Sequence, residues 1–286
     1  MNVGIIGYGS MGKMLLEKFS ESGRVSGNLL VANRTREKLA DVGEPVIVCG
    51  SYAELAACSD IIFLCVLPAG MKTVLEEIRG DLKEDSLIVS LNGSVTFGQL
   101  GTAVKQKMAK AIPAVTAEIN RSQTLVCFNE LAEPADKKRL KQLLEAVGDV
   151  IELPENEMGM GSELVSCMPG FIASIFDVLC REAGKHTKIP PDRIVHMVLG
   201  TMHATGELML QKHMSFEEVV SRVATKGGIT EEGTKVIYDQ FPETAGRLFE
   251  KTLEKRKLTA ERACEHFGSC GKEYQDAGGI QMDGRK

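Results

Sequence analysis

The sequence has no tryptophan, few aromatic residues and no long run of basic residues. Of 286 residues, 5% are aromatic, and 34 basic residues face 39 acidic ones, for a net charge of -5. Nucleic-acid binding proteins need a basic surface, often with aromatic side chains on which bases stack. We therefore expect no nucleic-acid partner. A hydrophobic fraction of 43% supports a packed core, and the length fits about two domains.

Signals for secretion, membrane insertion and metal binding are also missing. The chain begins Met1-Asn2-Val3, without the basic and apolar segments of a secretory leader. The best apolar run, residues 61–68, is far shorter than the ~18 residues that span a bilayer. Cys264, His266 and Cys270 are spaced as half a metal site, but no second ligand pair follows. We predict a cytoplasmic protein with reduced cysteines, no membrane contact and no metal.

The first half of the chain alternates β-branched runs with amphipathic stretches. Helical patterns such as 11–19 and 71–78 lie between short apolar runs. The predicted strands are 3–6, 29–32, 46–48, 61–66, 87–91, 109–112, 124–128 and 150–153. This alternation predicts an α/β Rossmann-type fold, with a doubly wound, parallel sheet covered on both faces.

Strand patterns end after Pro154, and long helical patterns follow. These cover residues 171–183, 192–211, 216–223, 231–240 and 244–267. We therefore predict a nucleotide-binding domain over residues 1–158 and an all-α dimerisation domain over residues 159–268. The Gly-rich and charged residues 269–286 are predicted to form a flexible tail.

A glycine-rich turn joins the first predicted strand to the first predicted helix. It reads Gly7-Tyr8-Gly9-Ser10-Met11-Gly12. This spacing between a strand and a helix is typical of dinucleotide binding, because Gly7 permits a tight turn, Gly9 admits the pyrophosphate, and Gly12 lets helix and strand pack closely. The amides and dipole of the helix N-terminus then favour the anion. The alternative is a glycine turn without a ligand.

The end of the second strand indicates which dinucleotide is bound. NAD sites place an acidic residue there, about 20 residues after the turn, for the ribose 2′-hydroxyl. Here the chain reads Asn33-Arg34-Thr35-Arg36, and the first acid is Glu37. Guanidinium and hydroxyl groups bind a 2′-phosphate that a carboxylate would repel. We predict NADP(H) as the cofactor; the alternative is that the arginines are merely solvated.

Residues for two common forms of nicotinamide-dependent catalysis are absent. No tyrosine is followed four residues later by lysine, so the Y-x-x-x-K dyad is missing. The fingerprint also resembles β-hydroxyacid dehydrogenases, whose catalytic lysine would fall within residues 168–175, but that stretch has none. His196 and His203 share a helical face without a partner acid, so we expect them to be packed rather than catalytic.

The segment from Thr225 to Thr230 is the strongest candidate for a substrate site. Two adjacent glycines and two threonines lie there between helical patterns. Exposed amides at a helix start can hold a carboxylate, and we predict this role for Gly227, Gly228 and Ile229. Thr225 adds a hydroxyl donor, and Thr230 is a predicted N-cap whose hydroxyl faces the ligand. A glycine turn with a threonine cap and no ligand stays open.

Several motifs together resemble the pyrroline-5-carboxylate reductase family over residues 1–255. Residues 225–233 resemble the signature S-P-G-G-x-T-x-x-G, and residues 63–68 resemble F-L-A-V-K-P. Residues 89–93, 111–113, 167–171 and 182–190 resemble, in turn, I-S-I-A-A, R-x-M-P-N, S-G-P-A-Y and D-A-G followed by L-P. The patterns around Cys167 and Lys226 resemble most closely the late-competence paralogue branch of this family.

The resemblance implies a reaction and a site. NADPH would reduce the C=N bond of 1-pyrroline-5-carboxylate to give L-proline, and Thr230 would donate a hydrogen bond to the ring nitrogen. Thr225 and the amides around Gly228 would hold the carboxylate. The cofactor would contact residues 7–12, residues 33–35, Val66, Pro68 and Asn92. The helical domain would form homodimers or larger rings.

The chain departs from the family at four positions. Leu67, Ala114, Met168 and Lys226 stand where the family has lysine, asparagine, glycine and proline. Two alternatives therefore stay open. The protein reduces another imine with NADPH, or it binds the cofactor and acts as a regulatory or structural partner.

Overall fold

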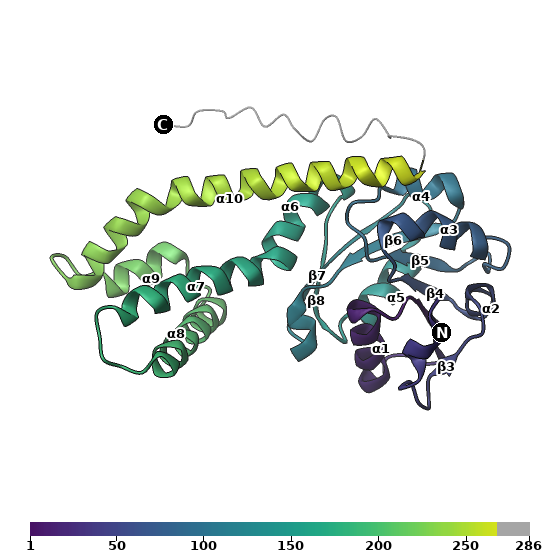
Figure 1. The fold of residues 1–286 in the computed structure, drawn as a ribbon, viewed down its shortest axis with the longest axis horizontal. Coiled ribbons are helices and arrows are strands. Elements are labelled where there is room, and N and C mark those ends of the chain that lie inside the picture. The colour runs from purple at the N-terminus through teal and green to yellow at the C-terminus, as the bar shows by residue number, and fades with distance from the viewer. Residues whose placement is uncertain (268–286) are drawn as a thin grey trace. The chain divides into compact units, whose positions relative to one another are not determined.

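An eight-stranded sheet forms the centre of the N-terminal part of the chain (Figure 1). The structure is a computed structural model that describes residues 1–267, so the predicted tail and Cys270 lie outside the described residues. The strands are β1 (Val3–Ile6), β2 (Leu29–Ala32), β3 (Ile47–Val48), β4 (Ile61–Leu64), β5 (Leu87–Ser90), β6 (Lys107–Ile112), β7 (Ser122–Phe128) and β8 (Gly148–Glu152). Their order is β3-β2-β1-β4-β5-β6-β7-β8, and all neighbours are parallel except β6 and β7. The predicted α/β Rossmann-type fold is confirmed.

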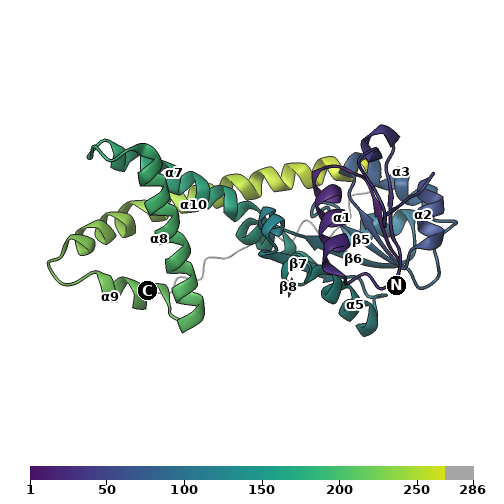
Figure 2. The same ribbon diagram turned by 90° about the horizontal axis from the view of Figure 1, so that it is seen from below.

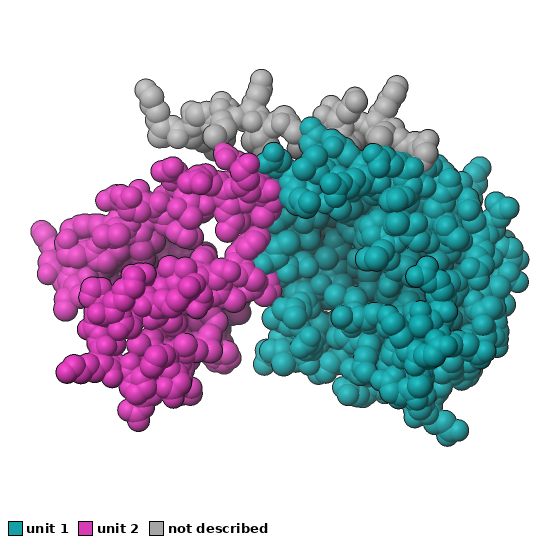
Figure 3. Space-filling model, in the orientation of Figure 1, with its two compact units in different colours: residues 1–167, 253–286 teal, residues 168–252 magenta. Residues whose placement is uncertain are grey.

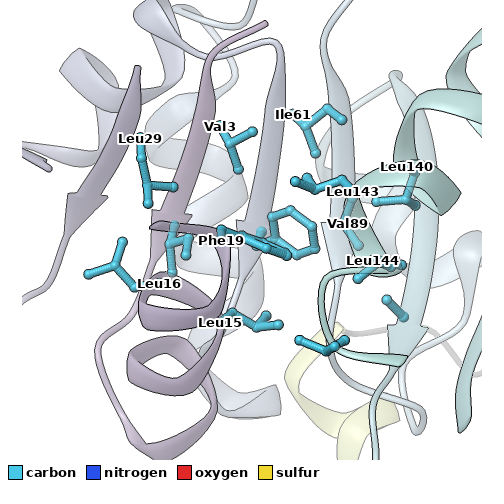
Figure 4. Close-up of a cluster of buried hydrophobic side chains, with 14 of the residues drawn as sticks. Val3, Leu15, Leu16, Phe19, Leu29, Ile61, Val89, Leu140, Leu143 and Leu144 are labelled. Carbon is cyan, nitrogen blue, oxygen red and sulfur yellow. The ribbon is translucent and has the colours of Figure 1, made fainter. Parts of the chain in front are cut away.

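Helices cover both faces of this sheet. They are α1 (Ser10–Ser22), α2 (Tyr52–Cys58), α3 (Pro68–Ile78), α4 (Phe97–Ala103) and α5 (Pro134–Leu144). On one face, α1 and α5 bury leucines together with Phe19, whose ring centroid lies 5.2 Å from that of Phe63 (Figure 4). On the other face, α2, α3 and α4 bury a second cluster around Met71 and Leu75. Strands buried on both sides read as continuous apolar runs, which is why the sequence shows these strands clearly.

Residues 158–267 are helical and contain no strand. The elements are α6 (Met158–Ser162), a widened π-helical turn (Glu163–Cys167), α7 (Met168–Gly184), α8 (Pro191–Lys212), α9 (Phe216–Val223) and α10 (Ile229–Phe267). Pro191 is the first residue of α8, where a missing N–H costs nothing. Helices α7 and α8 pack against each other (Figure 2).

The chain divides into two compact units (Figure 3). Of the described residues, the first unit contains 1–167 and 253–267, and the second contains 168–252. The predicted boundary instead lies near residue 158, with all of the last helix in the second domain. The structure differs because Ala263 and Phe267, at the end of α10, join the buried cluster of α2, α3 and α4.

The last helix is longer than predicted. Separate helices are predicted over residues 231–240 and 244–267, whereas α10 is continuous over 39 residues and contains Pro242 (Figure 1). A proline removes one helical hydrogen bond and crowds the preceding turn. Here the residues on both sides of Pro242 continue the helix.

The second unit leaves most of its apolar side chains uncovered. Within residues 168–252 the buried residues are Ile194 and Met214, whereas Met197 is 59% and Leu210 79% exposed. The helical run Glu155–Gly184 contains an 18-residue window with a mean hydropathy of 1.6, and the run is long and apolar enough to cross a membrane, judged by length and composition alone. A helix in the core of a protein assembly meets the same criterion. The expectation of no membrane contact stays a prediction.

Candidate cofactor and substrate sites

The glycine-rich turn connects β1 to α1 at the carboxyl edge of the parallel strands. Gly7 has a φ of +101°, and a β carbon there would lie 2.5 Å from the Cys65 carbonyl oxygen. A β carbon on Gly12 would lie 2.0 Å from the Gly7 carbonyl oxygen, whereas one on Gly9 would meet nothing within 4 Å. Packing therefore requires Gly7 and Gly12, and Gly9 leaves the turn open toward a ligand.

The N-terminus of α1 is suited to an anion. Gly9 is the N-cap residue, no side chain caps the helix, and the first turn has no acidic residue. Ser10 is exposed and Met11 is half-buried. Uncapped amides and the helix dipole together favour a phosphate at this position.

Tyr8, Lys13 and Asp41 form a polar cluster beside the turn. Lys13 Nζ lies 2.6 Å from Asp41 Oδ2 and 5.8 Å from the centroid of the Tyr8 ring. The hydrogen bond from Lys13 lowers the pKa of Asp41, while burial and the charge of Asp41 raise the pKa of Tyr8. Because Lys13 neutralises it, the Asp41 carboxylate opposes a nearby phosphate only weakly.

Asn33 holds the end of β2 against the glycine-rich turn. Its Oδ1 accepts a hydrogen bond from the Tyr8 N–H at 3.0 Å, and its Nδ2 donates to the Thr35 carbonyl oxygen at 2.8 Å. Arg34, Thr35 and Arg36 are exposed. Within residues 1–267 neither arginine forms an ion pair with a carboxylate. The arrangement offers a guanidinium and no acid at the position where a ribose 2′ group is recognised.

The other predicted cofactor contacts follow β4 and β5 at the same edge of the sheet. Val66 is half-buried, and Pro68 is the first residue of α3. The Asn92 Oδ1 accepts a hydrogen bond from the Ser94 N–H at 2.8 Å, which fixes the loop after β5. The carboxyl ends of parallel strands meet at one edge of a sheet. The structure thus brings the predicted cofactor residues of the first unit to a common edge.

The predicted substrate segment belongs to the second unit, where Thr225, Ile229 and Thr230 are exposed. Two of its amides already have partners: the Gly228 N–H donates to the Thr225 carbonyl oxygen at 2.8 Å, and the Gly227 N–H donates to Glu231 Oε2 at 2.7 Å. The expectation that these two amides are open to a ligand is therefore not met in this conformation.

Thr230 also lies elsewhere in its helix than expected. Helix α10 begins at Ile229, so Thr230 stands in the first turn and is not the N-cap. The physical reason is Gly227, whose φ of +74° reverses the chain early enough for the Gly228 carbonyl to accept from the Glu232 N–H at 3.4 Å. The Thr230 hydroxyl stays exposed beside the start of the helix.

An ion pair that the sequence analysis missed lies in the first unit. Glu163 is 1% exposed, and its Oε1 accepts hydrogen bonds from Arg256 Nε at 3.0 Å and Nη2 at 2.8 Å. Glu163 could have been noticed in the sequence, because it is an acidic residue within an apolar helical stretch. Arg256 stands 93 positions later among many charged residues, so nothing in its own sequence context marks it.

Residues that could hold a metal are not grouped in the described part of the chain. Across residues 1–267 no three His, Cys, Asp or Glu side chains lie close enough to form such a site. Of the spacing noted in the sequence, Cys264 and His266 lie on α10, and Cys270 is outside the described residues.

Family sequence models match both parts of the chain. The family described as NADP oxidoreductase coenzyme F420-dependent matches residues 2–93, and pyrroline-5-carboxylate reductase dimerisation matches residues 155–258. The crystal structure of Plasmodium falciparum pyrroline carboxylate reductase with NADP bound is similar in fold. Its TM-score is 0.76 at 20% identity, over 94% of this chain and 98% of that chain.

Two relatives from Bacillus subtilis (strain 168) align over most of the chain. "ComE operon protein 4" is 25% identical over 256 residues, which are 88% of this chain and 94% of the relative. "Pyrroline-5-carboxylate reductase 3" is 31% identical over 264 residues, which are 91% of this chain and 97% of the relative. The branch within the family stays a prediction, but the identity and coverage together establish that this chain belongs to the pyrroline-5-carboxylate reductase family.

Proposed function

We propose that the protein uses NADPH to reduce the C=N bond of 1-pyrroline-5-carboxylate to L-proline. The observation that carries the proposal is the open glycine-rich turn, with Arg34 unpaired beside it, in a chain of the pyrroline-5-carboxylate reductase family. The Plasmodium relative is described as having NADP bound. An NAD(P)-dependent oxidoreductase is the broader class to which these features point.

The residues of the first unit fit the cofactor. The amides at the start of α1 would hold the pyrophosphate, and Arg34 with Thr35 would bind the 2′-phosphate. Asn33 supports a preference for NADPH over NADH. It stands at the end of β2, where NAD sites have an acidic residue, and it accepts the Tyr8 N–H hydrogen bond without carrying a negative charge. When bound, NADPH supplies the hydride. Val66, Pro68 and Asn92 would line the part of the edge nearest the reacting ring.

An imine explains why the candidate substrate segment lacks a strong acid. An imine nitrogen is more basic than a carbonyl oxygen, so a hydroxyl donor is enough to orient it and to support its protonated form. We assign this role to Thr230, and the holding of the carboxylate to Thr225 and the Ile229 amide. Orientation and electrostatics would then carry the rate.

A second candidate is the reduction of a different imine, and Glu231 favours it. Glu231 Oε2 accepts a hydrogen bond from the Gly227 N–H at 2.7 Å, within the segment expected to hold the substrate. A carboxylate there repels an anionic substrate and attracts a cationic one. Met168 and Lys226, where the family has glycine and proline, would change the substrate site further.

Self-association follows from the match to a dimerisation family over residues 155–258. We propose a homodimer or a larger ring in the cytoplasm. The run Glu155–Gly184 lies within the matched segment. We therefore propose that a second copy of the chain packs against its apolar surface.

One assay separates these candidates. Loss of NADPH absorbance is followed with 1-pyrroline-5-carboxylate and with 1-pyrroline, which lacks the carboxylate. We expect turnover of the first, and at least about a tenfold fall in kcat/KM in Thr230→Val, because the donor to the imine nitrogen is lost. Thr230→Ser, which keeps the hydroxyl, is the matched control.

Each outcome has a distinct meaning. Normal turnover by Thr230→Val would show that Thr230 has been assigned wrongly. Turnover of 1-pyrroline alone would favour the second candidate, and Glu231→Gln should then improve use of the carboxylate-bearing imine. NADPH binding without turnover of any imine would identify a regulatory or structural paralogue.

A further inference from the structure

Glu163 is a buried carboxylate with one oxygen unpaired. Its Oε1 accepts both hydrogen bonds from Arg256, and its Oε2 is the sole buried side-chain oxygen or nitrogen atom within residues 1–267 that has no hydrogen-bond partner. Buried ion pairs rarely stabilise a fold more than apolar side chains would, and an unsatisfied oxygen makes the pair poorer still. Stability alone therefore does not account for this pair.

The backbone around Glu163 is unusual as well. Glu163 opens the turn Glu163–Cys167, the single π-helical turn of the described chain. Such turns are rare, and they occur frequently at functional sites. Burial, then the charge of Glu163 and a weak thiol hydrogen bond to its carboxylate, raise the pKa of Cys167. The thiol therefore stays neutral, and Arg256 is the cation that faces this carboxylate.

The Arg256 side chain is held in a defined orientation. It is 18% exposed, and its Nε and Nη2 both point to Glu163. A β carbon on Gly159 would lie 3.4 Å from Arg256 Cδ, so this glycine makes room for the stem. Within residues 1–267, Nη1 makes no hydrogen bond. A β carbon on Gly93 would lie 3.8 Å from Nη1.

Gly93 places this free donor at one end of the proposed cofactor site. It follows Asn92 in the loop after β5, at the carboxyl edge of the sheet. A dinucleotide lies across this edge at the switch point between β1 and β4. Because Arg34 assigns the 2′-phosphate to the β2 side, the nicotinamide half belongs on the side of β4, β5 and β6.

We propose that Arg256 Nη1 recognises the carbonyl oxygen of the nicotinamide carboxamide, and that Glu163 is the positioning residue that aims it. Glu163 engages Nε and one Nη2 hydrogen, which leaves the two Nη1 hydrogens and one Nη2 hydrogen of Arg256 as donors. Because Nη1 lies beside Gly93, at the part of the edge that belongs to the nicotinamide half, we take the carboxamide oxygen rather than a substrate carboxylate as its acceptor. The proposal rests on the proposed use of NADPH but not on the identity of the imine.

Calorimetric titration with two ligands tests this without turnover. The ligands are NADPH and 2′-phospho-ADP-ribose, which is the cofactor without its nicotinamide ring. For Arg256→Met we expect the Kd of NADPH to rise about tenfold, the loss typical of one good hydrogen bond, and the Kd of 2′-phospho-ADP-ribose to stay unchanged. Arg256→Lys retains a positive charge for Glu163 but has one side-chain nitrogen instead of three, so no second nitrogen is left for the cofactor. It should show the same selective rise in the Kd of NADPH. Lys257→Met, an exposed neighbour on α10, is the matched control.

A double-variant cycle tests the role of Glu163. Glu163→Leu should also weaken NADPH binding alone, and Glu163→Leu/Arg256→Met should be no weaker than Arg256→Met, because Glu163 acts through Arg256. Equal losses for both ligands, additive losses or an unchanged Kd would overturn the proposal. A change confined to the KM of an imine carboxylate would overturn it too, in favour of a substrate contact. Failure of the wild-type protein to bind NADPH would instead refute the proposed function on which it rests.

Discussion

At the scale of single residues, the glycines of the dinucleotide turn have separable roles. Gly9→Ala should fold normally, since its β carbon would meet nothing within 4 Å, but the added methyl group would keep a pyrophosphate from the backbone. We expect an NADPH Kd at least about tenfold higher with an unchanged melting temperature.

Gly12→Ala should lose about 1–3 kcal/mol of unfolding free energy because of the clash with the Gly7 carbonyl. Denaturant titration and NADPH binding check both, and normal binding by Gly9→Ala would contradict the assignment of the turn.

Asn33 should control the choice of cofactor. Asn33→Asp keeps an oxygen for the Tyr8 N–H but adds a negative charge next to the proposed 2′-phosphate site and provides an acceptor for a ribose hydroxyl. We expect the NADPH Kd to rise and the NADH Kd to fall, so that their ratio changes by at least about tenfold. Binding titrations measure the ratio. Lys38→Gln, an exposed change in the same segment, should leave the ratio as it is in the wild-type protein.

At the scale of elements, the N-terminus of α5 predicts a pH-dependent stability. The Glu133 N–H donates to Asp136 Oδ2 at 3.0 Å, Lys107 Nζ lies 3.3 Å from the same oxygen, and Arg139 pairs with the other. Burial works to raise the pKa of Asp136, but these hydrogen bonds outweigh it and lower the pKa below its ordinary value. The stabilisation is therefore present above the ordinary carboxyl pKa and is lost as the pH falls through the lowered one.

Asp136→Asn removes this stabilisation at neutral pH. We expect a loss of about 1–2 kcal/mol in unfolding free energy at about pH 7, and a smaller difference at about pH 3, because below the ordinary carboxyl pKa the unfolded wild-type chain already gains a proton there. Urea unfolding at both pH values provides the measurement. Asp149→Asn, at an exposed residue bonded to Gln123, is the control, and a difference that grows in acid would contradict the sign.

At the scale of the whole molecule, the uncovered apolar surface of the second unit predicts self-association. A shallow groove along α8 is lined by His196, Met197, Gly200, Thr201, Ala204, Thr205 and Leu208. We expect Met197→Glu to shift the protein toward monomers, because an unpaired carboxylate in an apolar interface costs several kcal/mol. Sedimentation velocity measures the change, with the exposed Lys212→Gln on the same helix as control. A wild-type protein that is already monomeric at micromolar concentration would contradict this expectation.

Features that depend on neighbours along the chain could be predicted from the amino-acid sequence. The apolar runs predicted all eight strands within a few residues, and the glycines of residues 7–12 marked the dinucleotide turn. The strands could be predicted because their side chains are buried on both faces of the sheet, which gives continuous apolar runs. The need for Gly7 and Gly12 could be predicted because these two residues are close in sequence and their backbones lie in close contact.

How distant segments of the chain meet depends on the three-dimensional fold. Separate helices were predicted over residues 231–240 and 244–267, yet α10 is continuous, and its end packs into the first unit through Ala263 and Phe267. The Glu163–Arg256 pair and the engaged amides of Gly227 and Gly228 likewise escaped prediction. Local patterns report propensity and periodicity, whereas these contacts depend on which surfaces come together, and that is set by burial across the whole fold.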